Sequence, residues 1–201
     1  LYLCTDSGLM SCNTVEESVE RAIQGGVSVV QLREKEASSR ELFELAKRVK
    51  RVTDKYYVPL IINDRLDICL AVDAAGVHLG QTDLPCSEAR RILGAEKIIG
   101  VSAATLEEAA KAQSDGADYL GVGAVFATST KTNTRPVTAE TIRAIRSAVD
   151  IPFVVIGGVN SENISGLHGL GINGAAVISA IISQPDITAA ARKMRQAAER
   201  L

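Results

Sequence analysis

The sequence predicts one domain with the (β/α)8 barrel fold, a TIM barrel whose functional site lies at the carboxyl ends of its strands. Short apolar runs alternate with longer segments of helical periodicity, and eight such units fit within the 201 residues. The apolar runs are continuous, as expected for parallel strands that are buried on both faces. The rival is an open doubly wound sheet, which usually has fewer strands and often a GxGxxG turn after the first. Thr5-Asp6-Ser7-Gly8 stands there instead.

Capping signals and apolar runs define the elements of the first half. Thr14 with Glu17 fits a capping box that opens a helix ending near Gly25-Gly26, and Ser38 with Glu41 fits a second box. The predicted strands are residues 1–4, 27–31, 59–62 and 76–79, and further helices are expected over residues 64–72 and 85–93.

The second half continues the alternation to the end of the chain. Thr105 with Glu108 caps a helix, and the longest loop covers about residues 123–137. The predicted strands are residues 97–101, 118–122, 152–156 and 174–178; helices are expected over 138–149, from near Asn160, and at the end of the chain. No linker or low-complexity tract divides residues 1–201, so we expect a single domain.

Composition excludes several classes of function. The formal net charge is -2, aromatic residues make up 3% and Trp is absent, which argues against nucleic-acid partners and anionic membranes. No apolar run approaches the roughly 18–20 residues of a membrane span. The cysteines form no CxxC pair, and we expect free thiols in a cytoplasmic protein: Cys4, Cys12, Cys69 and Cys86.

A polar segment follows the second predicted strand and is the first candidate for a ligand site. Gln31, Arg33 and Lys35 alternate, so on an extended chain their side chains point to one face. Arg grips phosphate with two hydrogen bonds, and Lys adds a point charge. Strand alternation points Glu34 the other way, which favours a structural role for its side chain.

Carboxylates and cations gather at the same predicted rim. Asp64 follows the third strand, Asp83 the fourth, and Lys131 lies in the loop after the sixth. A diphosphate bridged to two carboxylates by Mg²⁺ would explain both signs of charge. The local alternatives are a helix N-cap for Asp64 and a turn before Pro85 for Asp83.

A second phosphate region is predicted after strands seven and eight, the usual phosphate site of such barrels. It contains Gly157-Gly158 and Ile178-Ser179. Thr128, Ser129 and Thr130 precede Lys131 and are either phosphate ligands or ordinary loop hydroxyls. We interpret His78, inside an apolar strand, as a core or supporting residue, and His168 as structural.

Taken together in order, these motifs resemble the thiamine-phosphate synthase family across nearly the whole chain. The Gln31-Leu32-Arg33-Glu34-Lys35 segment resembles the family's diphosphate-binding segment, and Gly76 to Asp83 resembles the segment that ends in a metal-binding Asp. Asn63-Asp64 resembles its pyrimidine-contacting Asn and metal-binding Asp. Thr128-Ser129-Thr130-Lys131 resembles its Thr-x-Thr-Lys loop.

The resemblance implies a role for each matching residue. Catalytic roles fall on Arg33, Lys35, Ser102 and Lys131, and Asp64 and Asp83 would bind Mg²⁺. The pyrimidine diphosphate would contact Gln31, Leu32, Arg33, Glu34, Lys35, Asn63, Ser102 and Lys131. The thiazole phosphate would contact Thr128, Ser129, Thr130, Gly158, Ile178 and Ser179.

The implied enzyme is a transferase of thiamine biosynthesis with small-molecule substrates. It would join 4-amino-5-hydroxymethyl-2-methylpyrimidine diphosphate to 4-methyl-5-(2-phosphoethyl)thiazole, releasing pyrophosphate. Two departures concern the shape of the loop: Val125-Phe126-Ala127 stands where the family often has Pro, and Asn133 stands where an acidic residue is common.

Three alternatives remain open at this point. A thiazole tautomerase-like relative would not need the diphosphate and metal residues. A phosphosugar isomerase or epimerase would need a paired acid and base, and the sequence shows no strong pair. A sensor could bind thiamine precursors without turnover. The sequence does not fix the oligomeric state, so a homo-oligomer also stays open.

Overall fold

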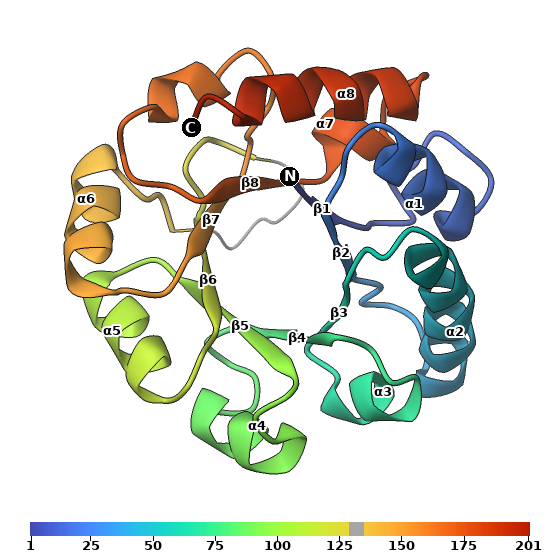
Figure 1. Cartoon of the computed structure of the whole chain (residues 1–201), viewed down its shortest axis with the longest axis horizontal. Coiled ribbons are helices and arrows are strands. Elements are labelled where there is room, and N and C mark those ends of the chain that lie inside the picture. Colours follow the sequence, from blue (N-terminus) through green and yellow to red (C-terminus); the bar gives the residue numbers. More distant parts are fainter. Residues whose placement is uncertain (129–134) are drawn as a thin grey trace.

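A computed structural model of the chain describes residues 1–128 and 135–201. Within these residues, eight parallel strands close into a barrel in sequence order, and the first strand pairs with the last. Figure 1 shows this ring of strands, with the helices arranged around its outside. The predicted TIM barrel is confirmed, and the open doubly wound sheet is excluded because the sheet has no free edge.

Every predicted strand overlaps an observed one. The fourth matches the prediction at both ends, since β4 covers Gly76–Leu79. The other strands are β1 Tyr2–Cys4, β2 Val29–Leu32, β3 Leu60–Asn63, β5 Ile98–Ala103, β6 Tyr119–Gly123, β7 Phe153–Ile156 and β8 Gly174–Val177.

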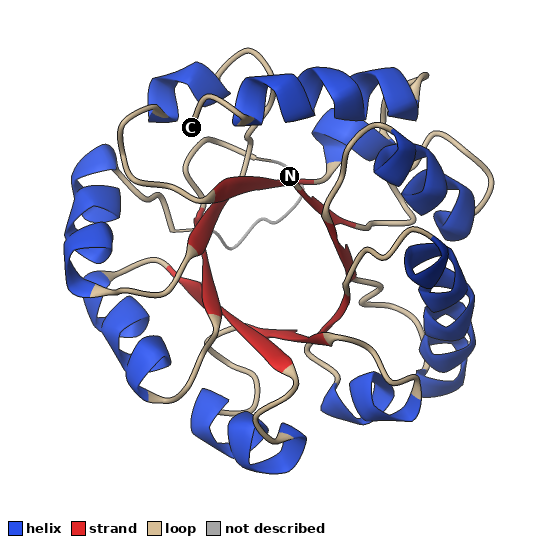
Figure 2. Cartoon of the chain, in the orientation of Figure 1, coloured by secondary structure: helices blue, strands red, loops and turns tan. Residues whose placement is uncertain are grey.

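The helices pack against the outer face of the barrel (Figure 2). Ser38 and Glu41 form a complete capping box before the second helix, as predicted. Thr14 and Thr105 each accept a hydrogen bond from the backbone N–H three residues on. The described helices are α1 Val15–Gln24, α2 Ser39–Lys55, α3 Leu66–Ala71, α4 Cys86–Leu93, α5 Leu106–Ser114, α6 Ala139–Ala148, α7 Ser179–Ile182 and α8 Ile187–Ala198.

The helix predicted from near Asn160 is wrong. That segment contains only one 3₁₀ turn, Ile164–Leu167. Gly169 and Gly171 follow it with φ of 73° and 71°, and this left-handed conformation ends any right-handed helix. The short α7 directly after β8 was not predicted, because the apolar run of the strand continues into it.

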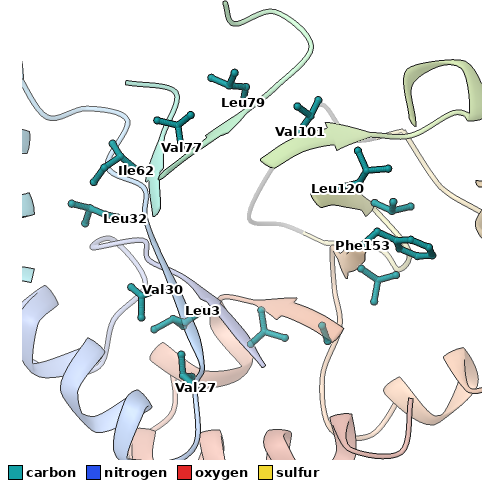
Figure 3. Close-up of a cluster of buried hydrophobic side chains, with 14 of the residues drawn as sticks. Leu3, Val27, Val30, Leu32, Ile62, Val77, Leu79, Val101, Leu120 and Phe153 are labelled. Atoms are coloured by element: carbon teal, nitrogen blue, oxygen red, sulfur yellow. The ribbon is translucent and has the colours of Figure 1, made fainter. Parts of the chain in front are cut away.

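The main hydrophobic core lies between the barrel and the helices. Figure 3 shows part of it, with Val30, Val77 and Leu120 among the labelled side chains. Alternate residues of the same strands face the barrel interior. Several of these are glycines, and a Cβ added at Gly100 would meet the Tyr119 ring at 2.1 Å. Small residues therefore keep room inside the barrel for a few large polar side chains.

Two expectations from the sequence, about the cysteines and about membrane-spanning helices, can be compared with the structure. All four cysteines are free, as predicted. Among the described residues, no helix combines the length and the apolar character needed to cross a membrane.

Candidate active site

A cavity of about 600 Å³ opens at the carboxyl ends of the strands and extends into the barrel. Residues from all eight strands, β1 to β8, and from the loops after them line it. The predicted site residues that lie on its wall are Gln31, Arg33, Lys35, Asn63, Asp64, Asp83, Ser102, Thr128, Gly158, Ile178 and Ser179. The structure thus brings together in one cavity residues that are up to 148 positions apart in the sequence, from Gln31 to Ser179.

The segment after β2 divides as strand alternation predicts. Arg33 and Lys35 line the cavity, and the Arg33 guanidinium lies 3.6 Å from the Asp6 carboxylate. Leu32 is buried in the core outside the barrel. The Glu34 carboxylate accepts hydrogen bonds from Thr5 Oγ1 at 3.1 Å and Ser7 Oγ at 2.5 Å.

Glu34 therefore holds the loop after β1 against the end of β2. Neither its side chain nor that of Leu32 lines the cavity. The substrate contacts that the resemblance implied for Leu32 and Glu34 stay predictions.

Two carboxylates face each other on one wall. Asp64 adopts φ of 63°, an uncommon conformation for a residue other than glycine. Its backbone N–H donates to the His78 carbonyl at 2.9 Å. The N-cap of α3 is Arg65, and no side chain caps the helix there, so the N-cap interpretation of Asp64 is wrong. Strained backbone of this kind is concentrated at functional sites.

The electrostatics of this pair are unfavourable without a cation. Burial, followed by the hydrogen bond and the negative charge of Asp83, raises the pKa of the Asp64 carboxyl to about 6, while Lys35 and Asn63 act in the opposite direction. Asp83 also accepts a hydrogen bond from the Gly80 N–H at 2.6 Å, which closes the turn after β4. Its structural and site roles are thus compatible.

The pair fits a hard divalent cation. The described residues contain no group of three or more His, Cys, Asp or Glu that could hold a metal ion. Mg²⁺ does not require one, because it commonly takes one or two carboxylates and completes its octahedron with water and substrate oxygens. Asp64 and Asp83 are the residues that could hold such an ion here.

The opposite wall is built from exposed backbone. Gly157 and Gly158 have φ of 98° and 64° after β7, and Ile178-Ser179 leads from β8 into α7. The Asn163 side-chain amide donates to the Gly158 carbonyl at 2.9 Å and accepts from the Asn160 N–H at 2.9 Å. Sequence reasoning missed Asn163, because it lies in the segment that was assigned to a helix.

The loop after β6 is only partly described. Ser129, Thr130 and Lys131 lie outside the described residues, as does Asn133, and the predictions for them stay predictions. Beyond them, Arg135 pairs with Glu108 of α5 at 2.5 Å, and its carbonyl accepts from the Ala124 N–H at 3.1 Å. Both charged residues line the cavity.

A hydrogen-bonded chain of side chains crosses the barrel interior. Gln31 Nε2 donates to the Tyr2 hydroxyl at 2.8 Å, and that hydroxyl lies 2.7 Å from the hydroxyl of Tyr119. The Tyr119 hydroxyl lies 3.0 Å from His78 Nδ1, and His78 Nε2 lies 2.9 Å from Ser102 Oγ. We refer to these five residues as the interior chain.

The interior chain changes the interpretation of His78. The prediction of a core or supporting residue agrees with its 8% exposure, yet it also lines the cavity. A Ser–His pair suggests nucleophilic catalysis, but its second ring nitrogen contacts a phenol where a Ser-His-Asp triad has a carboxylate. His168 is exposed and does not line the cavity.

Comparison with known proteins identifies the family. The family model described as thiamine monophosphate synthase matches residues 1–181. The chain belongs to this family. The thiamine-phosphate synthase of Ruminiclostridium cellulolyticum is 58% identical, over 96% of this chain and 92% of that protein.

Two further relatives support the membership of this thiamine monophosphate synthase family. The thiamine-phosphate synthase of Clostridium botulinum is 53% identical, over 100% of this chain and 94% of that protein. A solved structure of thiamine phosphate pyrophosphorylase from Pyrococcus furiosus superimposes with a TM-score of 0.91 at 40% identity, covering 98% of this chain and 94% of that chain. The family resemblance read from the motifs is confirmed.

Proposed function

We propose that the chain is a thiamine-phosphate synthase, a transferase of thiamine biosynthesis. It joins 4-amino-5-hydroxymethyl-2-methylpyrimidine diphosphate to 4-methyl-5-(2-phosphoethyl)thiazole and gives thiamine phosphate and pyrophosphate. The observation that carries the proposal is a single cavity with two walls whose residues each suit a phosphate group. One wall combines Arg33 and Lys35 with the two carboxylates, and the other exposes the backbone around Gly158 and Ser179.

The first wall binds the diphosphate and assists its departure. Arg33 and Lys35 meet the charge that grows on the leaving group as the carbon–oxygen bond breaks. Lys131, from the loop after β6, is assigned to the same task on the strength of its motif. Asp64 and Asp83 hold Mg²⁺, which when bound neutralises part of the diphosphate charge.

The second wall holds the thiazole phosphate. Thr128, Gly158, Ile178 and Ser179 surround the space after β6, β7 and β8, and the residues Ser129 and Thr130 are proposed to complete it. Asn163 fixes the Gly158 carbonyl and so keeps the adjacent backbone in place. The thiazole nitrogen is thereby directed at the pyrimidine methylene, and positioning converts a two-substrate encounter into a reaction within one complex.

The chemistry requires no protein nucleophile. The pyrimidine methylene can carry positive charge because its own amino-substituted ring stabilises it, and the thiazole nitrogen then attacks. Asn63 and Ser102 hold the ring in the barrel, close to the diphosphate wall. Residues 1–201 are proposed to act as one catalytic domain; a cytoplasmic location and a homo-oligomer stay predictions.

The decisive experiment incubates the purified protein with both substrates and Mg²⁺ and measures pyrophosphate and thiamine phosphate. Release of both in equal amounts is expected. Absence of both would refute the synthase and leave the tautomerase-like or sensor alternatives. The Asp83→Asn variant should need a higher Mg²⁺ concentration for half-maximal rate, and an unchanged metal titration would contradict its ligand role.

A further inference from the structure

The interior chain links two cavity-lining residues, Gln31 and Ser102, through three side chains that hydrogen bond in series. Tyr2 is 4% exposed and Gln31 5% exposed, so water has little access to these two side chains. Burial raises the pKa of both phenols, Tyr2 and Tyr119, well above their ordinary range. Each phenol therefore keeps its single hydrogen at neutral pH and has one hydrogen bond to donate.

Counting hydrogens gives the chain a direction. Gln31 donates to Tyr2, so the Tyr2 hydrogen must go to its other partner, Tyr119. The Tyr119 hydrogen then goes to His78 Nδ1, and a neutral His78 carries its hydrogen on Nε2 and donates it to Ser102 Oγ. In this arrangement each step has one donor and one acceptor.

With the Gln31 amide oriented as in the structure, its Nε2 towards Tyr2, the opposite direction fails at its last step. If Ser102 donates to His78, His78 to Tyr119 and Tyr119 to Tyr2, the Tyr2 oxygen receives two hydrogens. The hydrogen of Tyr2 itself then has no acceptor among the partners that residues 1–128 and 135–201 provide. Protonating both nitrogens of His78 meets the same obstacle. A buried hydroxyl without an acceptor is strongly disfavoured.

We infer that the interior chain fixes opposite polarities at two points of the cavity: Gln31 presents its Oε1 as an acceptor and Ser102 presents its hydroxyl as a donor. Tyr119 is the positioning residue that sets this polarity, because it joins Tyr2 to His78. A ligand that complements this acceptor and this donor is a heteroaromatic ring with an amino donor beside a ring-nitrogen acceptor. This inference deepens the proposed function and rests on it for the identity of the ring.

Two glycines make the chain possible. A Cβ at Gly121 would lie 2.9 Å from His78 Cε1, and one at Gly100 would meet the Tyr119 ring. The rings of His78 and Tyr119 lie with their centroids 5.5 Å apart and are tilted by 43° relative to each other. The side chains are therefore held by packing as well as by hydrogen bonds, which is what a fixed polarity requires.

The tautomer of His78 tests the inference without relying on activity. Nitrogen-15 NMR of histidine-labelled protein reports it directly, and the chain has only two histidines. The exposed His168 is assigned with a His168→Gln variant. Hydrogen on Nε2 of His78 is expected at pH 7.5; hydrogen on Nδ1, or on both nitrogens, would overturn the proposed direction.

Two matched variants then separate the links of the chain. Tyr119→Phe keeps the ring but removes the donor to Nδ1, so the His78 signals should move towards the average of two tautomers. Tyr2→Phe leaves that donor in place, so the tautomer should be unchanged. Equal effects of the two variants would contradict the assigned role of Tyr119. Thermal melting confirms that each variant folds, and the wild-type tautomer decides the direction whether or not they do.

Activity measurements give a second, separable result. Tyr119→Phe should lower kcat/KM for the pyrimidine diphosphate by about 10- to 100-fold, by analogy with the loss of a group that orients a metal ligand. The KM for the thiazole phosphate should change less than about two-fold, since hydrogen-bond direction at the ring affects the other substrate little. The variant should also prefer the amino substrate over its oxo analogue less strongly than wild type. An unchanged preference would refute the specificity role, whereas an inactive wild type would refute only the synthase.

Discussion

Comparing Gly158→Ala with Gly169→Ala distinguishes two reasons why a glycine is needed at position 158, in the wall proposed to bind the thiazole phosphate. One is the close approach of neighbouring atoms, and the other is the left-handed backbone conformation. Gly158 has φ of 64°, and an added Cβ would lie 2.4 Å from the Ala127 carbonyl oxygen and 2.9 Å from Phe126 Cβ. Gly169 has φ of 73° with nothing within 4 Å of its Cβ position. The pair thus shares the conformational penalty and differs in the clash.

The expected magnitudes follow from this difference. Left-handed backbone costs alanine roughly 1–2 kcal/mol, so Gly169→Ala should lose about that much stability. Gly158→Ala should lose a further 1–3 kcal/mol or so, because the chain before Thr128 must shift to relieve the overlap. That shift moves Thr128, a proposed ligand of the thiazole phosphate, so the KM for this substrate should rise at least about ten-fold, a loss of about 1.4 kcal/mol in binding.

Urea unfolding measures the stabilities, and steady-state kinetics with the thiazole phosphate varied measures the KM. Gly169→Ala serves as the matched control, with normal kinetics expected. Equal losses of stability in the two variants, together with a normal KM for Gly158→Ala, would refute the argument that Gly158 is required for close approach.

Three further predictions concern individual side chains. Asp64→Asn should raise the melting temperature of the metal-free protein at pH 7.5 but not at pH 4. The pKa of the Asp64 carboxyl in the folded protein, about 6, exceeds its ordinary value, so the charged form destabilises the fold and this cost appears only as pH rises through 6. A gain at pH 4 alone would contradict this reasoning. Asn163→Ala should raise the KM for the thiazole phosphate several-fold while leaving that for the pyrimidine diphosphate unchanged, because it frees the Gly158 carbonyl; equal changes in both would indicate a general loss of structure. Lys131→Ala should cripple turnover with an unchanged thermal melt, and near-normal activity would show that the loop motif was misassigned.

The barrel was predictable because its signals are local and repeated. Continuous apolar runs and caps such as Ser38 with Glu41 depend on neighbours within a few residues. The helix prediction for the segment after Asn160 failed because the apolar spacing there resembles that of a helix. The glycines that prevent a helix do so by adopting left-handed backbone conformations. Pattern alone does not distinguish a flexible glycine from one that must be left-handed.

The residues at the strand ends could be predicted from the sequence, whereas the interior chain beneath them could not. Strand ends meet at one rim in any such barrel, so Arg33, Lys35 and Asp83 could be grouped from sequence order. Tyr2 and Tyr119 touch across the barrel at a separation of 117 residues, and that contact depends on the register of every strand between them. The left-handed turn at Asp64 likewise arises from its surroundings.

The glycines inside the barrel have a thermodynamic consequence for binding. Barrels of this kind normally fill their interior with layers of branched side chains. Here part of the interior stays open as a cavity, and Cys4, Val154, Ile156 and Ala176 form part of its wall. An aromatic ring that enters this space covers apolar wall and takes the place of a missing layer. Binding should therefore have a negative heat-capacity change, as the burial of a core side chain does. Calorimetry at several temperatures measures this change.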